Sequence, residues 1–453
     1  SYRHLPADAG TLFRRLGCHP GADLDAPAAA ALAGVDLDEV TRLLDLLVRA
    51  HMVRRDPGGR YGMHDLLRAY ALDLAMGTDT GADLHAARTR LFDHYLEGAT
   101  EAVRVLYPTA AAGEVPQPQG DPERLRAWLA AELPNLVAVC EYAAGHDWPG
   151  HAVRLAATLY RYLESGHYAE ALAIHGAALA AARSTGDRAG EAQALTNLGL
   201  VHRLLGQYGP ATERLTRALE LHRLSGDQAG AARTLSNLGI VADRLGAHAA
   251  AKTHLEQALT AYRELGNRHG IAAVLTNLGG LCGSVGQHAR AAEHLTEAHD
   301  LFAALGDRSG AASALANLGE AETNLGGYTR AAGHLEQARV LFEELGHRYG
   351  QAIALSNLGP VHSRLGEHDR ALADLEQALA IFRDTGHRYG EASVLNGLGE
   401  ALHAAGRPGA LDRHTAALAI ATETGDRDER TRAQAGIARA EAGRYTLSRN
   451  GTA

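Results

Sequence analysis

A tripeptide, Asn-Leu-Gly, returns every 40 residues through the middle of this chain. Its copies begin at Asn197, Asn237, Asn277, Asn317 and Asn357. A variant, Asn396-Gly397-Leu398-Gly399, follows in phase. Self-similarity at a fixed period of this length predicts a solenoid, in which each structural unit packs only against its neighbours.

Each repeat unit is expected to form two helices. A Gly-Asp, Gly-Asn or Gly-His pair precedes each unit. Asp or Asn in this place caps a helix by accepting a bond from a backbone N–H, as we expect at Asp187 and Asn267. A second glycine, such as Gly206, is expected to end the first helix of the unit.

Small and apolar residues recur at the sequence spacing that places them on one face of a helix, as expected for helices that pack through that face. In the first helix they are Leu195, Leu198 and Gly199, at positions i, i+3 and i+4. The second helix carries its own set: Ala211, Leu215, Ala218 and Leu219. Glycine and alanine at these positions allow neighbouring helices to approach closely.

The pattern resembles the tetratricopeptide repeat in a 40-residue variant, longer than the usual repeat of about 34 residues. A degenerate copy around Leu155 and Tyr162 lies one period upstream. The resemblance implies a mainly α-helical fold, with about seven repeats over residues 151–441 forming a right-handed superhelix. A polar capping helix is expected from Asp428, and residues 442–453 are expected to form a tail.

Composition narrows the class of protein. The chain has 453 residues, enough for two or three domains, and a net charge of −9. A negative charge argues against binding to nucleic acid. The three cysteines, Cys18, Cys140 and Cys282, have neither metal-site nor disulfide spacing, which indicates a reducing compartment. No apolar run is long enough to cross a membrane, so we expect a cytoplasmic protein without a membrane partner.

Residues 1–76 have a different pattern. Helical periodicity at about 8–17, 27–34 and 37–51 precedes two short strand patterns around Asp56-Pro57-Gly58-Gly59. Three helices and a hairpin predict a winged-helix domain. Residues 1–80 contain nine Arg against eleven Asp and Glu, so this domain is not expected to bind DNA directly.

The triplet Met63-His64-Asp65, straight after the hairpin, resembles the MHD motif of signal-transducing (STAND) ATPases with an NB-ARC module. The resemblance implies that His64 contacts the β-phosphate of ADP and that Asp65 is its structural partner, once the ATPase domain is present. A helix N-terminus favours such a phosphate. The alternative is that His64 only caps the hairpin and Asp65 the following helix.

The order of these parts resembles the C-terminal half of large actinobacterial regulators of the Streptomyces antibiotic regulatory protein (SARP) type. Residues 77–150 would then be a helical adaptor, and the DNA-binding and ATPase domains would precede Ser1. A phosphate-binding loop ends in Gly-Lys-[Ser/Thr]. The only lysine, Lys252, follows Ala251 within a repeat. We therefore expect no enzyme activity and no cofactor in this chain, with ADP or ATP bound only by the parent protein.

A candidate binding groove comes from helical geometry. At about 100° per residue, Asn197 points away from the packed stripe of its helix. We therefore expect the five repeated asparagines to line the concave face of the superhelix and to bind the backbone of an extended peptide or a small-molecule signal. The following residues are expected on the same face: Gln193, Arg233, Arg244 and Arg364, against Glu320 and Glu400. The alternative is that each asparagine bonds only to a neighbouring helix.

Two function classes follow from these features. The first is a ligand-sensing, protein-interaction and autoinhibitory module of a STAND-type transcriptional regulator; the resemblance implies a regulator of secondary metabolism, such as antibiotic biosynthesis. The second is a free-standing scaffold that binds a protein or peptide. A metal site is not expected: His254, His294 and His334 share a repeat position, but one repeat shifts a side chain by about 10 Å.

Overall fold

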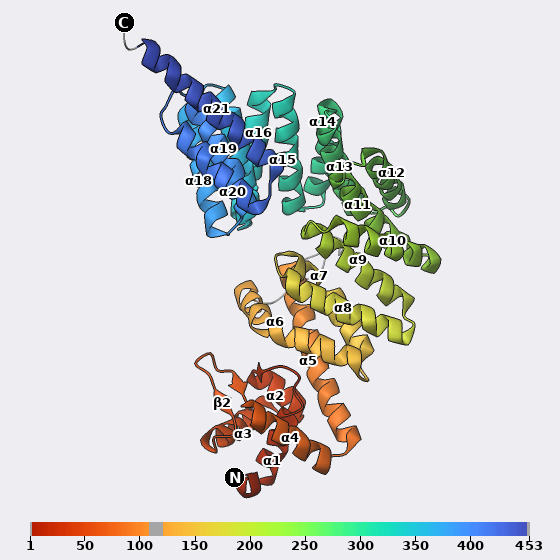
Figure 1. The fold of residues 1–453 in the computed structure, drawn as a ribbon. Helices are drawn as coiled ribbons and strands as arrows, with labels where there is room; N and C mark the ends of the chain where they lie inside the picture. The colour runs from red at the N-terminus through yellow and green to blue at the C-terminus, as the bar shows by residue number, and fades with distance from the viewer. Residues whose placement is uncertain (1, 108–120, 451–453) are drawn as a thin grey trace. The chain divides into compact units, whose positions relative to one another are not determined.

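The computed structural model describes residues 2–107 and 121–450, with side chains as far as residue 442. The chain divides into two compact units, Ser1–Leu245 and Gly246–Ala453. Each unit is built mainly from helices (Figure 1). The predicted divisions at residues 76, 150 and 441 stay predictions.

The first unit opens with short helices and three two-residue strands. They are η1 Tyr2–His4, α1 Ala7–Leu16, β1 Asp23–Leu24, α2 Ala26–Ala33, α3 Leu37–Arg49, β2 Arg54–Arg55, β3 Tyr61–Gly62 and α4 Asp65–Thr78. The three helices and two strands expected in this part of the chain are confirmed. The strand β1 is not predicted by the sequence, and it pairs antiparallel with β3 to give a sheet of order β1-β3-β2.

The sheet and the helix caps fix the local geometry. Tyr61 lies opposite Leu24 on one side and Arg55 on the other. Asp25 begins α2 by accepting from the backbone N–H of Ala28, and Asp36 begins α3 in the same way. Gly34, with φ +70, ends α2, and the Asp36 cap then begins α3, so the alanine-rich and leucine-rich segments form two separate helices.

Two long helices follow, α5 Gly81–Leu106 and α6 Pro122–Gly145. Helix α5 contacts both α2 and α7 (Pro149–Glu164), and so joins the opening helices to the first hairpin of the repeats (Figure 1). Phe92 and Tyr95 of α5 are fully buried in the shared core. Residues 108–120, within the predicted adaptor, lie outside the described residues.

The repeats are helical hairpins of nearly constant length. In the first unit they are α7, α8 Tyr168–Thr185, α9 Arg188–Leu204, α10 Tyr208–Ser225 and α11 Gln228–Arg244. In the second unit they are α12 His248–Glu264, α13 Arg268–Ser284, α14 His288–Ala304, α15 Arg308–Asn324, α16 Tyr328–Glu344, α17 Arg348–Arg364, α18 His368–Asp384, α19 Arg388–Ala404, α20 Ala410–Thr424 and α21 Arg427–Asn450.

The predicted caps and packing faces of the repeats are confirmed. Asp187 accepts from the backbone N–H of Gly190 at 2.9 Å, and Asn267 does the same at the start of α13. Gly206 has φ +70, the left-handed conformation that ends the first helix. A Cβ on Gly199 would lie 2.6 Å from Cγ of Leu215, so this glycine permits the close approach of α9 and α10.

The last helix extends further than the sequence predicts. Helix α21 includes the expected capping segment and continues to Asn450, so residues 442–450, expected to form a tail, are helical. Residues 451–453 lie outside the described residues. Of the helices that the structure describes, none is long and apolar enough to cross a membrane.

Candidate binding groove

The first helices of successive repeats lie beside one another in the first unit, where α9 contacts both α7 and α11. Asn197 is on the face of α9 that meets them. Its carboxamide oxygen accepts from Nε2 of Gln193 at 2.9 Å and from Nη1 of Arg233 at 3.4 Å. These two side chains cover Asn197, which is 2% exposed. Three predicted groove residues therefore meet in one cluster.

Several N–H donors in this cluster have no acceptor among the described residues. They are Nδ2 of Asn197, Nη2 of Arg233 and Nε of Arg203, and all three atoms are buried. A buried polar group without a partner costs about 1–3 kcal/mol. Because these atoms are buried, oxygen atoms of a ligand can bond to them once the covering side chains of Gln193 or Arg233 move aside.

Charged groups around the cluster are poorly hydrated. Burial lowers the pKa of Arg203, and the nearby Glu164 opposes that effect. Burial raises the pKa of Glu164, and Arg233, Arg203 and Arg161 oppose it. The Arg233 guanidinium also lies 5.9 Å from the centre of the Tyr160 ring, a cation–π arrangement. The arginines outnumber the acid here, which favours a ligand with acidic or carbonyl oxygens.

The sequence prediction missed Tyr160, Glu164 and Arg203. Glu164 lies two periods before Arg244, so the reasoning that put Arg244 on this face also applies to Glu164. Tyr160 is in the degenerate first repeat, where the absence of the tripeptide hid its position. Arg203 follows His202 near the end of α9, and no feature of the period distinguishes it.

The remaining predicted groove residues are less enclosed. Asn237 is half-buried and donates to the backbone carbonyl of Arg233 at 3.1 Å, and Arg244 is exposed. In the second unit the asparagines are half-buried: Asn277, Asn317 and Asn357. Arg364 and Glu400 line a cavity there, whereas Glu320 is exposed. The five repeated asparagines, called the asparagine ladder below, thus lie in different environments although they share one repeat position.

His64 lies at the N-terminus of α4. Its Nδ1 accepts from the backbone N–H of Leu66 at 3.4 Å, and the residue is exposed. Asp65 is the first residue of the helix, with a side chain 92% exposed and 3.2 Å from Nη2 of Arg68. Arg68 also donates to the carbonyl of Gly21 at 2.7 Å. His64 and Asp65 are therefore held on a fixed helix start and remain accessible.

The same helix presents apolar side chains to solvent. Leu66 is 77% exposed, Tyr70 44% and Met76 68%. Their spacing places Leu66 and Tyr70 one helical turn apart on α4. An exposed apolar strip next to His64 is typical of a surface that another domain covers.

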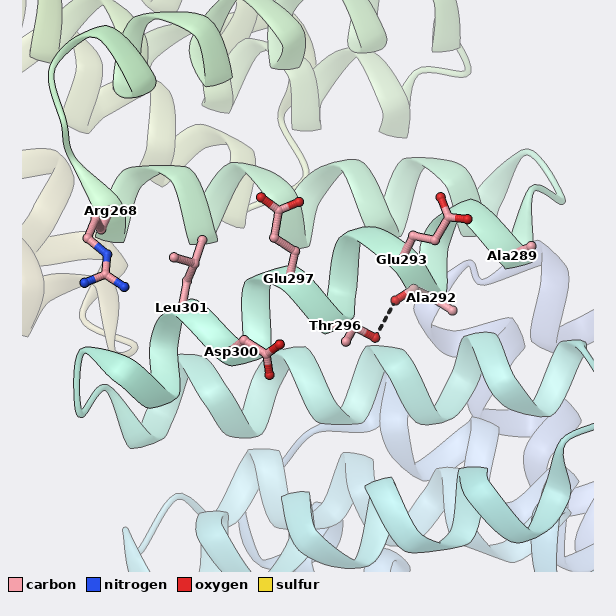
Figure 2. A pocket seen from close by; sticks show the side chains of 8 residues that line it. All are labelled: Arg268, Ala289, Ala292, Glu293, Thr296, Glu297, Asp300 and Leu301. Carbon is pink, nitrogen blue, oxygen red and sulfur yellow. Dashed lines mark hydrogen bonds between the residues drawn. The ribbon is translucent and has the colours of Figure 1, made fainter.

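A shallow hollow runs along α14 in the second unit (Figure 2). Its volume is about 690 Å³, and Glu293, Glu297 and Asp300 lie along it with Arg268 at one end. The Thr296 hydroxyl donates to the carbonyl of Ala292 at 2.8 Å, and Arg263 is 3.9 Å from Glu297. The charge of this hollow is therefore opposite to that of the Asn197 cluster. Among the described residues, no group of His, Cys, Asp or Glu is arranged to hold a metal ion.

Comparison with known families identifies the repeats. The family described as Tetratricopeptide repeat matches residues 151–224, 211–264, 230–304 and 310–384, together more than half of the chain. The chain is a tetratricopeptide repeat protein.

Two curated relatives are similar to this tetratricopeptide repeat protein over 226 residues. Regulatory protein AfsR of Streptomyces griseus is 31% identical over 48% of this chain, and AfsR of Streptomyces coelicolor is 30% identical over 47% of it. The matched stretch spans 23% of the length of each relative.

A solved structure shares the fold of the tetratricopeptide repeat protein. It is the Signal Transduction ATPase with Numerous Domains (STAND) protein with a tetratricopeptide repeat sensor from Pyrococcus horikoshii. The TM-score is 0.65 over 99% of this chain and 65% of the other, at 11% identity. At this identity the likeness concerns the fold alone.

Proposed function

We propose that this chain is the ligand-sensing and autoinhibitory part of a STAND-type transcriptional regulator, and that its repeats bind the signal at the Asn197 cluster. The observation that carries the proposal is the set of buried N–H donors on Asn197, Arg203 and Arg233. A neutral or mildly acidic peptide segment would supply their missing acceptors. The similarity to AfsR supports a regulatory role.

Residues 1–76 would relay the signal. Their three helices and β2–β3 hairpin follow the element order of a winged helix. In the resting state His64 would contact the β-phosphate of ADP, with Asp65 as its structural partner, while the exposed strip of α4 would cover an NB-ARC ATPase domain outside this chain. The parent protein would act in the cytoplasm on genes of secondary metabolism, such as antibiotic biosynthesis. This chain itself would have no enzyme activity and no direct contact with DNA.

The groove is tested with Arg233→Ala, which removes one of the three proposed donors. Fluorescence anisotropy with labelled extended octapeptides carrying zero to two acidic residues measures binding. We expect at least a tenfold loss of affinity with a melting temperature that changes by only a few degrees. The control is Arg217→Ala, which removes a surface arginine 2.8 Å from Glu220 and should leave binding unchanged. A fall of many degrees would instead show that the cluster only holds the helices together.

The relay is tested in the intact regulator. His64→Ala should loosen the ADP-bound resting state and raise basal transcription from a reporter, whereas the exposed His4→Ala serves as control. The isolated chain should bind ADP only weakly in calorimetry. The alternative, a free-standing scaffold that binds a protein or peptide, predicts that His64→Ala has no effect on regulation.

A further inference from the structure

The second unit contains a cavity of about 520 Å³ between α17, α19, α20 and α21. This volume is within the range of about 300–1,000 Å³ of small-molecule sites. Its lining is Pro360, Ser363, Arg364, Gly397, Glu400, Ala401, His403, Ala404, Ala410, His414, Gly436, Arg439 and Ala440. The cavity is separate from the Asn197 cluster, so the inference below does not depend on the proposed function.

Small residues open this cavity where other repeats have larger ones. Gly397 is 40 residues after Asn357 and so takes the asparagine position of the ladder. A Cβ on Gly397 would meet only the side chain of Leu375, at 3.2 Å. Glycine within a helix costs about 1 kcal/mol relative to alanine, and a Cβ here would require only a small shift of the end of the Leu375 side chain. Ala401 and Ala404 likewise stand one period after Val361 and Arg364.

A buried histidine forms one wall of the cavity. His414 is 2% exposed and stands against Gly399, where Leu375 stands against Gly359 one repeat earlier. A Cβ on Gly399 would be 2.6 Å from Nε2 and 2.7 Å from both Cδ2 and Cε1, so this glycine lies over the face of the ring. The ring nitrogens therefore point outward along the edges of the ring.

The hydrogen bonds of Asn396 determine which nitrogen of His414 carries the proton. Nδ2 of Asn396 donates to the backbone carbonyl and to Oε2 of Glu429, so its Oδ1 is the acceptor. Nδ1 of His414, 2.9 Å from that oxygen, must then be the donor. Burial keeps the pKa of His414 below its ordinary value, against the effect of Glu400. The neutral ring therefore has an accepting Nε2, which has no partner among the described residues.

Arginine side chains give the cavity an excess of positive charge. Glu400 is already bound by Arg432 through two hydrogen bonds of 2.9 and 2.7 Å. Arg439 is 3.9 Å from the same carboxylate, and its side chain is 54% exposed. Arg364 is exposed at the mouth of the cavity. Two arginines are thus available to a ligand, while the carboxylate is engaged.

We propose that this cavity binds a small molecule that carries a carboxylate or phosphate group and, at its other end, a hydrogen-bond donor. The anionic group contacts Arg364 and Arg439, and the donor, an O–H or N–H, bonds to Nε2 of His414. Gly397 makes room for the body of the molecule. The seventh repeat therefore differs from the five repeats before it, which carry an asparagine at this position, by having a ligand site there.

The probes for this site are 4-hydroxybenzoate, 4-hydroxyphenyl phosphate, neutral 4-hydroxybenzamide and 4-methoxybenzoate, which lacks the donor. Saturation-transfer NMR on the full chain measures binding up to millimolar concentration. We expect 4-hydroxybenzoate or 4-hydroxyphenyl phosphate to bind, and the stronger of the two identifies the anionic group. The amide should bind at least tenfold more weakly, and 4-methoxybenzoate more weakly than 4-hydroxybenzoate. Absence of binding by both anions overturns the proposal.

Variants then locate the site. Gly397→Asn restores the ladder residue and should abolish binding of the anionic probe, with a melting temperature within a few degrees of the wild type, because only the end of the Leu375 side chain must shift. Arg364→Gln with Arg439→Gln should weaken the anion at least tenfold and leave the amide unchanged. The control is Arg413→Gln, an arginine of α20 outside the cavity and 3.9 Å from Glu376. Undiminished binding by either test variant, or an equal loss in the control, overturns the proposal.

Discussion

Two regions differ in how far apart in the sequence their contacting residues lie. The first comprises the described residues between 2 and 145, and the second comprises the helical hairpins after them. In the first region, Arg60 bonds to Glu132 across 72 positions, and His19 bonds to Tyr95 across 76. In the hairpins, Asp187 caps a helix three residues away, and Arg233 reaches Asn197 across 36. A substitution in the first region therefore removes a contact that occurs once in that region. In the repeats, the effect of a substitution depends on how the residues around it differ from those at the same position in the other repeats.

The largest effect is expected at Glu132, which is 1% exposed. Arg60 donates to both of its oxygens, and Nδ2 of Asn135 donates to one at 2.7 Å. Glu132→Ala leaves Arg60 with Asp23 as its remaining carboxylate partner and Nδ2 of Asn135 without an acceptor, which should lower the free energy of unfolding by about 3 kcal/mol. Urea unfolding followed by fluorescence of Trp128 and Trp148, the two tryptophans of the chain, measures it.

Glu220→Ala is the control in the same unit. Its carboxylate is 55% exposed and 2.8 Å from Arg217, so its loss should lower stability by less than about 1 kcal/mol. Equal effects of the two substitutions would contradict the distinction between the regions.

Acid should destabilise the first region through His19. Burial lowers the pKa of His19 to about 4, against about 6.5 in an unfolded chain. As pH falls below about 6.5 the unfolded state takes up the proton first, so the free energy of unfolding decreases until about pH 4, by up to about 3 kcal/mol. Above pH 6.5 this contribution is constant.

The check is urea unfolding at pH 7.0, 5.5 and 4.5, with His19→Gln beside the wild type. The variant should show a flatter dependence on pH. It should not be flat, because burial also lowers the pKa of His175 in α8 to about 4. An unchanged pH dependence in His19→Gln would show that His19 does not titrate as its burial implies.

The range of contacts also explains what the sequence could predict. The cap at Asp187 and the close approach at Gly199 follow from local spacing, which the period repeats. Nothing local pairs Arg60 with Glu132, so their contact could not be predicted. In the groove, Gln193, Asn197 and Arg233 were predicted to share a face because all three keep the period. The cavity at Gly397 was missed because glycine replaces the repeated asparagine there, and a sequence pattern does not show what the missing side chain leaves open.

Adjacent glycines in α13 test the packing of the repeats. A Cβ on Gly279 would lie 2.5 Å from Cγ of Leu295, whereas a Cβ on Gly280 meets nothing within 4 Å. Gly279→Ala should therefore destabilise by about 1–3 kcal/mol. Gly280→Ala should stabilise by about 1 kcal/mol, and Gly283→Ala, also unhindered, by a similar amount.

Urea unfolding followed by far-UV circular dichroism gives the signs of these changes. Opposite signs at Gly279 and Gly280 would confirm that only one of the two glycines is required for packing. Impaired signalling by the stabilised Gly280→Ala, Gly283→Ala protein, in the intact regulator, would indicate a hinge in this helix. Unchanged signalling would leave the two glycines without a functional role.

The smallest effects are expected within the asparagine ladder, and they separate its two interpretations. Asn197 accepts two hydrogen bonds and is 2% exposed. Asn197→Ala leaves Gln193 and Arg233 without that acceptor and should lower the free energy of unfolding by about 1–2 kcal/mol. Asn317 is half-buried, and Asn317→Ala should change stability by less than about 0.5 kcal/mol, as at other surface sites. Urea unfolding of both variants measures the difference. If both lose about 1 kcal/mol or more, Asn317 supports the solenoid as Asn197 does; if only Asn197→Ala does, the carboxamide of Asn317 is not required for stability and remains available to a ligand.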